Sequence, residues 1–382
     1  MKLNIENRVT ELVTEKRKIL LVSNGFYPEI SPRSYRATEL AKELYRQGHE
    51  VTVISKFRKH DYSEFLNEFR LTFKMWGRAR FPLIPDFKHK PFSLLSRALT
   101  RILLTLFEYP GIEEMFRVRN VLREEAGYDI IISFAVPYPV HWGVAWSRSG
   151  KHRIADVWVA DCGDPYMGDV LDSFRKPFYF KYLEKWFCRK ADYITIPIES
   201  AKPGYYSEFQ SKIRIIPQGF DFNIEEKQER LPVNNVPTFA YAGGFLPGAR
   251  DPECLMKCLV NLDQPFRFLI FTNKPGLFDE YRITMKEKLS VSDYIPRNEL
   301  MIVLSGMDFL INFDNNTTRN SPSKLIDYAI VNRPVLNVRQ DFDKNDLLAF
   351  LNGDYRRQML LPDIQQYHIR NIARLFLDLK VN

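Results

Sequence analysis

The sequence predicts an α/β protein made of two doubly wound parallel-sheet domains that face a cleft. Its length of 382 residues suits two domains better than one. Short apolar strands alternate with amphipathic helices in both halves of the chain, which is the pattern of parallel sheets. The stretch 218–237 is polar and rich in Pro and Asn, as expected of a linker. Hydrophobic residues make up 45% of the chain and charged residues 27%, so two cores can form.

The first strand–helix–strand unit is the clearest. The apolar run 18–23 predicts a buried strand, and Asn24-Gly25 predicts a turn after it. Ser31 can cap a helix that begins with Pro32 and carries an apolar stripe over 37–45. A second strand follows at 51–55. Such units build parallel sheets, in which ligands bind at the carboxyl ends of the strands.

The same alternation continues to the end of the chain. Further strands are expected at 129–134, 153–159, 193–197, 213–217, 238–242, 266–272, 308–313 and 334–338, and helices at 251–262, 276–289, 298–305 and 321–331. The expected domains are residues 1–222, a linker at 223–236, and a second domain at 237–354. A helix over 355–382 is expected to pack back on the first domain.

Several classes of protein are excluded. The most apolar stretch, 102–107, is far shorter than the roughly 20 residues that cross a bilayer. Residues 1–18 lack the apolar core of a signal peptide, so we expect a cytoplasmic protein. The four cysteines form no CxxC pair and are expected to be buried free thiols rather than zinc ligands or disulfides: Cys162, Cys188, Cys254 and Cys258.

The excess of positive charge is concentrated in one segment. The net charge is +8, and residues 70–105 hold eight basic side chains and one acidic one, with aromatic residues between them. Leucines and isoleucines over 94–106 would form one helical face. One hypothesis is peripheral binding to an anionic membrane, on the inner face of the cytoplasmic membrane. The alternative is a solvated basic face over a core helix. No nucleic-acid-binding motif is found.

The start of the helix expected at 321–331 has the features of a phosphate site. Ser321 can cap it, and free N–H groups at a helix start bind phosphate. Lys324 adds a positive charge in the first turn, and Asp327 lies on the same face, where it can accept hydrogen bonds from a ribose diol. The alternative is an ordinary Lys–Asp pair on a helix surface.

A second phosphate-binding element follows the strand at 238–242. Gly243 and Gly244 allow phosphate to approach the backbone, and Arg250 can donate pairs of hydrogen bonds to a diphosphate. A glycine turn followed by a surface arginine is the alternative interpretation.

The segment 321–335 (SPSKLIDYAIVNRPV) resembles the donor-site signature of retaining GT-B glycosyltransferases, which have two Rossmann-like domains. The segments 18–55, 215–221 and 241–250 are similar to other parts of that family, in the same order. The resemblance implies that Arg250 and Lys324 hold the donor diphosphate, that Ser321 and Ser323 line the same site, and that Ile295 flanks the base. It also implies a UDP- or GDP-sugar donor, retention of configuration, and no metal or other cofactor. In such a protein residues 1–222 would form the acceptor-side domain and residues 237–354 the nucleotide-sugar-binding domain.

The sequence departs from that family pattern at three places. Asp327 replaces the ribose-binding Glu and is one methylene shorter. An acidic residue of the family falls on Arg319. The first loop has 30–33 (ISPR) in place of a glycine pair, which leaves Gly25 and Arg33 as the acceptor-side loop residues.

The catalytic candidates lie in the first domain. Asp164 follows a predicted strand in a segment that resembles a functional loop of some relatives, although an Asp-Pro turn is the plain alternative. His141 follows another strand, and it is either a sugar or phosphate ligand or a structural histidine.

The function expected is glycosyl transfer to a glycan or polyprenyl-linked acceptor in surface polysaccharide or glycoconjugate synthesis. A GT-B-fold nucleotide-sugar 2-epimerase and an inactive nucleotide-sugar-binding protein remain as alternatives.

Overall fold

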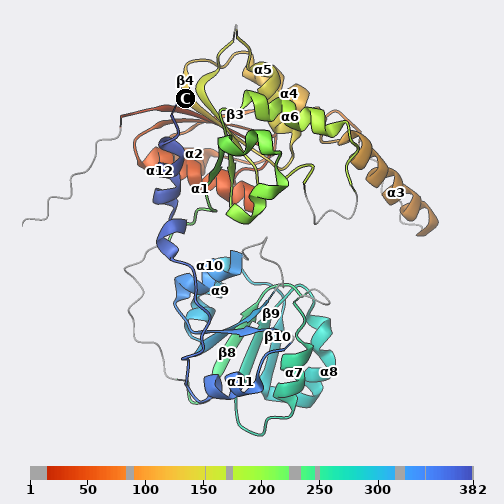
Figure 1. The fold of residues 1–382 in the computed structure, drawn as a ribbon, viewed down its shortest axis with the longest axis vertical. Coiled ribbons are helices and arrows are strands. Elements are labelled where there is room, and N and C mark those ends of the chain that lie inside the picture. The colour runs from red at the N-terminus through yellow and green to blue at the C-terminus, as the bar shows by residue number, and fades with distance from the viewer. Residues whose placement is uncertain are drawn as a thin grey trace, which may run out of the picture. The chain divides into compact units, whose positions relative to one another are not determined.

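The computed structural model describes residues 15–82, 90–150, 152–168, 175–222, 234–245, 250–314, 323–339 and 341–380. The chain forms two compact units (Figure 1). Unit 1 comprises Met1–Phe220 and Ile369–Asn382, and unit 2 comprises Asp221–His368.

Unit 1 is built on a parallel sheet of seven strands in the order β3-β2-β1-β4-β5-β6-β7. Its strands are β1 (Lys18–Ser23), β2 (Glu50–Ser55), β3 (Thr72–Met75), β4 (Tyr128–Phe134), β5 (Ala155–Asp161), β6 (Tyr193–Ile196) and β7 (Ile213–Ile215). Its α-helices are α1 (Pro32–Arg46), α2 (Ser63–Glu68), α3 (Lys90–Phe107), α4 (Glu113–Leu122), α5 (Pro139–Ser147), α6 (Phe180–Lys190) and α12 (Ile369–Leu377). Two 3₁₀ helices, η1 (Glu199–Gly204) and η2 (Ser207–Lys212), precede β7.

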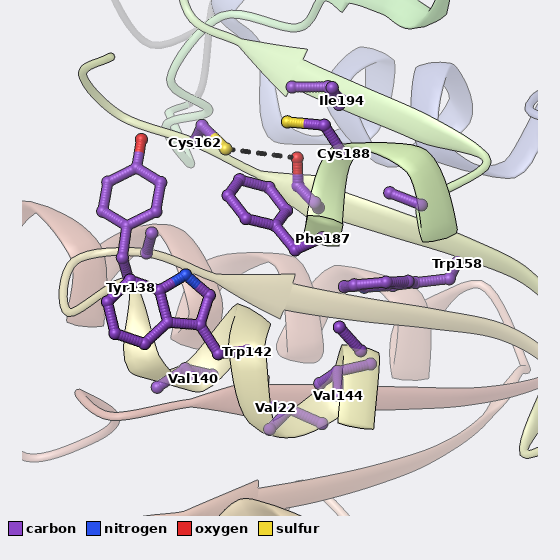
Figure 2. Packing of buried hydrophobic residues seen from close by; sticks show 14 of the residues in the cluster. Val22, Tyr138, Val140, Trp142, Val144, Trp158, Cys162, Phe187, Cys188 and Ile194 are labelled. Carbon is purple, nitrogen blue, oxygen red and sulfur yellow. Dashed lines mark hydrogen bonds between the residues drawn. The ribbon is translucent and has the colours of Figure 1, made fainter. Parts of the chain in front are cut away.

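Helices cover both faces of this sheet because alternate residues of each strand point to opposite sides. Ile19 and Leu21 of β1 pack on one face with α1 and α12. Leu20 and Val22 pack on the other face, in a cluster that includes Trp142 (Figure 2). Both faces are therefore apolar, as expected of a parallel sheet.

Unit 2 has a parallel sheet of five strands in the order β10-β9-β8-β11-β12. Its strands are β8 (Thr238–Ala242), β9 (Arg267–Phe271), β10 (Leu289–Ser292), β11 (Phe309–Phe313) and β12 (Val335–Val338). Its helices are α7 (Glu253–Val260), η4 (Pro275–Phe278), α8 (Asp279–Met285), η5 (Lys286–Lys288), α9 (Arg297–Ser305), α10 (Ser323–Val331), α11 (Lys344–Leu351) and η6 (Ile364–Tyr367).

A buried tyrosine fixes α10 against this sheet. The Tyr328 hydroxyl accepts a hydrogen bond from the Ala242 N–H at 3.2 Å and donates one to the Ile311 carbonyl at 3.1 Å. The helix is thereby attached to β8 and β11, so the side chains at its start are held near the carboxyl ends of those strands.

The chain returns to unit 1 at Ile369, so the expected helix over 355–382 is wrong in extent. Residues 355–368 remain with unit 2, where the Met359 N–H donates to the Val335 carbonyl at 2.8 Å. The part that packs on unit 1 begins with α12, whose Ile372 and Phe376 belong to the apolar cluster that α1 covers, and it includes Leu379 just after this helix.

Two strands were not predicted. β3 is a short edge strand with mostly exposed side chains, and β10 alternates buried and exposed residues over four positions. The helix expected at 276–289 is confirmed in position, but it is divided into η4, α8 and η5, and it ends at Lys288 because β10 begins at Leu289. Cys162 and Cys188 are buried free thiols, whereas Cys254 is exposed, contrary to expectation. Ser321 and most of the linker 223–236 lie outside the described residues.

Candidate functional site

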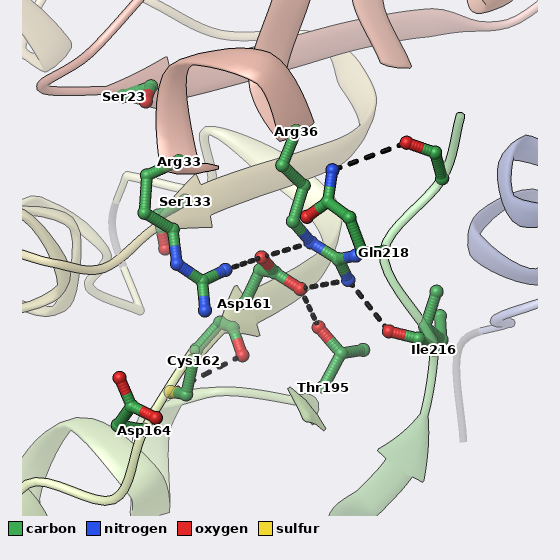
Figure 3. A network of polar contacts seen from close by, with 12 residues as sticks. Ser23, Arg33, Arg36, Ser133, Asp161, Cys162, Asp164, Thr195, Ile216 and Gln218 are labelled. Carbon is green, nitrogen blue, oxygen red and sulfur yellow. Dashed lines mark hydrogen bonds and ion pairs between the residues drawn. The ribbon is translucent and has the colours of Figure 1, made fainter. Parts of the chain in front are cut away.

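The carboxyl end of β5 holds a buried carboxylate at the centre of a charged network in unit 1 (Figure 3). Asp161 is fully buried and is bound by Arg36 through two contacts of 2.7 Å, one to each carboxylate oxygen. Arg33 donates to Asp161 Oδ2 at 3.0 Å, and the Thr195 hydroxyl donates to Oδ1 at 2.6 Å. The carboxylate is therefore shared by two arginines, one turn apart on α1, and by the neighbouring strand β6.

Arg36 also connects this carboxylate to two distant parts of unit 1. Its guanidinium donates to the carbonyls of Ile216 and Pro217, at 2.9 and 2.6 Å, just after β7. It also lies over the ring of Phe376 in α12, 5.5 Å from the ring centroid. Burial alone would raise the pKa of Asp161, but the charges of Arg36 and Arg33 outweigh it and lower that pKa. Asp161 is thus a structural anion that holds together the segments at the carboxyl end of the unit 1 sheet.

Arg33 stands at the exposed side of this network. About a fifth of its side chain is exposed, at 22%. A Cβ at position 163 would lie 1.6 Å from Arg33 Nη2, so a side chain there would displace the guanidinium from its present position. Asp164, the next residue, is exposed, and its carbonyl accepts a hydrogen bond from the Tyr138 hydroxyl. Gly25 lies against the start of α1, because a Cβ there would be 2.3 Å from Ser34 Oγ. The structure thus brings Arg33 and the Asp164 loop together.

His141 is placed differently from the catalytic role expected for it. Its side chain is fully buried, with Nδ1 2.8 Å from Ser133 Oγ and Nε2 3.5 Å from Cys162 Sγ. Burial lowers the pKa of His141 to about 3, so the ring is neutral near pH 7. Because both ring nitrogens have protein partners inside the core, the catalytic assignment is corrected to a structural one.

In unit 2, two cations lie near each other at the carboxyl end of β8. Lys324 Nζ stands over the ring of Tyr241, 4.7 Å from its centroid. Lys324 Nζ and Arg250 Nε are both buried, and neither has a hydrogen-bond partner within the described part of the chain. Gly243 has φ +156°, and a Cβ there would be 2.7 Å from the Tyr241 hydroxyl. Buried donors without partners are costly, which favours a site whose acceptors belong to a ligand.

The protonation of Lys324 is sensitive to this arrangement. Burial, and then the charge of Arg250, lowers the pKa of Lys324 to about 7, although Asp314 acts in the opposite direction. Asp314 is itself bound to Arg339 at 2.9 Å. An anion that binds between Lys324 and Arg250 would therefore favour the charged ammonium form.

Asp327 is paired within the protein. Arg297 donates to Asp327 Oδ1 from Nε at 3.0 Å and from Nη2 at 2.6 Å. The loop between β10 and α9 holds Ile295, which is half-buried, and Tyr294, whose hydroxyl lies 3.5 Å from a Cβ placed on Gly244. Gly244 and Tyr294 therefore lie together at the carboxyl end of the unit 2 sheet. Ser323 begins α10, and its side chain is outside the described set, as is Ser321.

Among the residues that the structure describes, no group of three His, Cys, Asp or Glu side chains could hold a metal ion. Of the helices described, none is both long and apolar enough to cross a membrane. The deciding comparison is with protein families: residues 34–223 match the model of Glycosyltransferase Family 4. This segment resembles a family 4 glycosyltransferase domain. The matched segment covers α1 from Ser34 onward, Asp161 with Arg36 and Thr195, and Asp164, but it begins just after Arg33.

Solved structures resemble the chain over both units. A glycosyltransferase from Rickettsia africae ESF-5 is 13% identical, with 95% of this chain and 97% of the other covered and a TM-score of 0.59. HepE from Anabaena in complex with UDP-glucose is 11% identical, with coverage of 95% and 98% and a TM-score of 0.51. A UDP-GlcNAc 2-epimerase from Methanocaldococcus jannaschii is 11% identical, with coverage of 94% and 98% and a TM-score of 0.53. No curated protein sequence matches the chain.

These identities are low, so the solved structures establish the fold alone. They confirm the predicted GT-B fold of two parallel-sheet α/β domains. Four residues beside the candidate sites were missed as functional or supporting residues by sequence reasoning: Arg36, Thr195, Tyr241 and Arg297. A signal for Arg36 was present in the sequence. This residue lies one helical turn after Arg33, so both arginines can reach the carboxylate of Asp161 at the end of a strand.

Proposed function

We propose that the protein is a retaining glycosyltransferase that moves a hexosyl group from a UDP- or GDP-sugar to a glycan or polyprenyl-linked acceptor, in surface polysaccharide or glycoconjugate synthesis. The observation that supports this most is a pair of buried nitrogen atoms, Lys324 Nζ and Arg250 Nε, which have no hydrogen-bond partner in the described part of unit 2. A diphosphate would supply the missing acceptors. The structure of HepE, which this chain resembles in fold, was determined in complex with UDP-glucose.

The two cations also suit the chemistry of transfer. When the bond to the sugar breaks, the nucleoside diphosphate leaves as an anion with added charge on its terminal phosphate. Lys324, Arg250 and the N–H groups at the start of α10 would stabilise that charge without reorganisation of solvent. Proton transfer to the departing phosphate from the acceptor hydroxyl needs no metal in this scheme. In unit 1, we assign Asp164 and Arg33 to contacts with the sugar or the acceptor.

A screen of nucleotide sugars by thermal shift tests the donor assignment, because a ligand of the folded state raises the melting temperature. We expect one UDP- or GDP-sugar to raise it, and the same compound to be hydrolysed or transferred by the purified protein. NMR of the anomeric proton in the product should show the configuration of the donor. Binding without turnover would support an inactive binding protein, and conversion of UDP-GlcNAc to its 2-epimer without acceptor would support an epimerase.

We further propose that unit 1 binds an anionic membrane peripherally, through a surface made by α3 and the start of α6. The end of α3 exposes large apolar side chains, including Ile102 at 52% and Phe107 at 58%. Phe178 and Tyr182, at 71% and 60%, extend this surface, and the Tyr179 hydroxyl donates to the Leu106 carbonyl. Figure 1 shows α3 projecting from the sheet of unit 1.

The charges around this apolar surface favour a lipid partner with anionic headgroups. Arg97 and Arg101 lie on α3, and Lys181 lies beside Tyr182 with its Nζ 5.0 Å from the ring centroid. Each basic side chain near an anionic bilayer contributes about 1 kcal/mol, and apolar side chains add insertion. A polyprenyl-linked acceptor would be presented at such a surface.

Flotation with vesicles tests the membrane surface. We expect the protein to float with vesicles rich in phosphatidylglycerol, less so at high salt, and not with pure phosphatidylcholine vesicles. Ile102→Glu combined with Phe107→Glu should abolish flotation. Ile283→Glu, at a site in unit 2 that is 76% exposed, is the matched control and should float like the wild type. Flotation of the double variant at wild-type level would refute the proposal.

A further inference from the structure

The ion pair between Arg297 and Asp327 joins the starts of two helices in unit 2. Arg297 is the first residue of α9, and Asp327 lies one turn after Lys324 in α10. Two nitrogens of the guanidinium donate to the same carboxylate oxygen, at 3.0 and 2.6 Å. The side chains remain 35% and 19% exposed. A ligand at the carboxyl end of the unit 2 sheet can therefore reach both members of the pair.

The neighbours of the pair indicate which part of a nucleotide would meet it. Lys324, one turn before Asp327, belongs to the proposed diphosphate site. Tyr294, three residues before Arg297, is 53% exposed and lies beside Gly244, in the segment expected to flank the base. In a nucleoside diphosphate the ribose connects the base to the diphosphate. A ligand that spans these two groups of residues would place its ribose at the ion pair.

The chemistry of a ribose requires more than a short carboxylate. Each of its two adjacent hydroxyls can donate one hydrogen bond and accept others, whereas an ionised carboxylate can only accept. Asp327 is one methylene shorter than the glutamate of the enzymes that the chain resembles, and Arg297 already occupies Oδ1. A guanidinium held beside the carboxylate provides donors that a lone glutamate does not have.

We propose that Arg297 is a specificity-determining residue for the ribose of the donor. Asp327 accepts a hydrogen bond from one ribose hydroxyl, and Arg297 orients that carboxylate and donates to the second hydroxyl. The inference rests on the proposed donor function, because it places a nucleotide at the start of α10. The competing interpretation is an ion pair that only joins α9 to α10. Leu304 and Leu325 already pack those helices together, and partly exposed ion pairs add little stability.

Binding of deoxynucleotides to the full-length protein separates the two interpretations. Calorimetry would compare UDP with 2′-deoxy-UDP and 3′-deoxy-UDP, and GDP with its two deoxy forms. For the nucleotide that binds, the wild type should lose about tenfold in affinity when the hydroxyl facing Arg297 is removed, as is typical of a hydrogen bond to a charged group. The Arg297→Ala variant should bind the parent nucleotide more weakly than the wild type does, by a similar factor. This variant should bind that deoxy form and the parent nucleotide with equal affinity. Arg357→Ala, which removes an ion pair with Asp346 at 2.7 Å on α11, should behave like the wild type.

A longer carboxylate provides the rescue. Asp327→Glu should reach both hydroxyls itself, so Arg297→Ala should cost less affinity in that background than in the wild type. Arg297→Ala could instead lower the affinity for the parent nucleotide and for both deoxy forms by the same factor, in the wild type and in Asp327→Glu alike. In that case the pair is structural and the inference is wrong. If the wild type binds no nucleotide of either series, the proposed donor function fails and the inference falls with it.

Discussion

Replacing Lys324 with alanine is expected to lower kcat/KM for the donor by about a hundredfold to a thousandfold, the usual effect of removing one preorganised group that stabilises developing negative charge. Lys324 Nζ is buried, stands over the Tyr241 ring and has no hydrogen-bond partner in the described chain, so its loss removes a donor that is available to a ligand. Lys257→Ala is the matched control, since that side chain is 67% exposed and pairs with Glu253 on α7. Turnover by Lys324→Ala within about threefold of the wild type would contradict the donor assignment, because a group that stabilises developing charge contributes far more.

The same lysine predicts how donor binding depends on pH. Without a ligand, the pKa of Lys324 is lowered to about 7, so the side chain is largely neutral at pH 8. A bound diphosphate raises that pKa, and binding must then take up a proton. Affinity for UDP or GDP should fall between pH 7 and pH 9, by up to about tenfold per pH unit. Titrations in buffers of different ionisation enthalpy measure the proton uptake directly, and Lys324→Ala should show none of it.

Replacing Asp161 with asparagine should destabilise unit 1 by about 3–5 kcal/mol, because it leaves the buried charge of Arg36 without its partner. All five tryptophans of the chain lie in unit 1, so tryptophan fluorescence during chemical denaturation reports the unfolding of this unit. Asp156→Asn, on the same strand but 56% exposed, is the control and should change stability by less than about 1 kcal/mol.

The effect of Asp161 should also depend on pH with a definite sign. The pKa of Asp161 is lower in the folded state than its ordinary value, so the carboxylate stabilises the fold above that ordinary value, about 3.9, and the stabilisation is lost as pH falls through the folded pKa. The difference between the wild type and Asp161→Asn should therefore be complete at pH 7 and shrink in acid. A difference below about 1 kcal/mol at pH 7 would show that the network contributes no more than an exposed pair.

The sequence was sufficient to predict the alternation of strands and helices, because both faces of each parallel sheet are buried and the strands are therefore continuous apolar runs. The strand at Lys18–Ser23 was predicted to the residue. β3 and β10 were missed because a short strand at a sheet edge is exposed on one or both faces and lacks such a run.

The candidate site was less predictable because it depends on contacts between distant segments. Lys324 and Arg250 were identified by their positions near a helix start and a glycine turn. The burial of their nitrogens, by contrast, depends on tertiary packing around Tyr241. The pairing of Arg297 with Asp327 joins residues 30 positions apart, and no local pattern indicates it. For His141, the residue type suggested chemistry, but the complete burial of the ring decided its role.

The position of α12 has a consequence for how the protein is made. Ile372 and Phe376 complete the apolar cluster beneath α1, yet they follow every residue of unit 2 in the sequence. A ribosome therefore releases all of unit 2 before it releases the segment that closes the core of unit 1. Most of the unit 1 sequence emerges first, but part of one face of its sheet stays uncovered until α12 emerges. The sequence of unit 2 is therefore complete before that of unit 1.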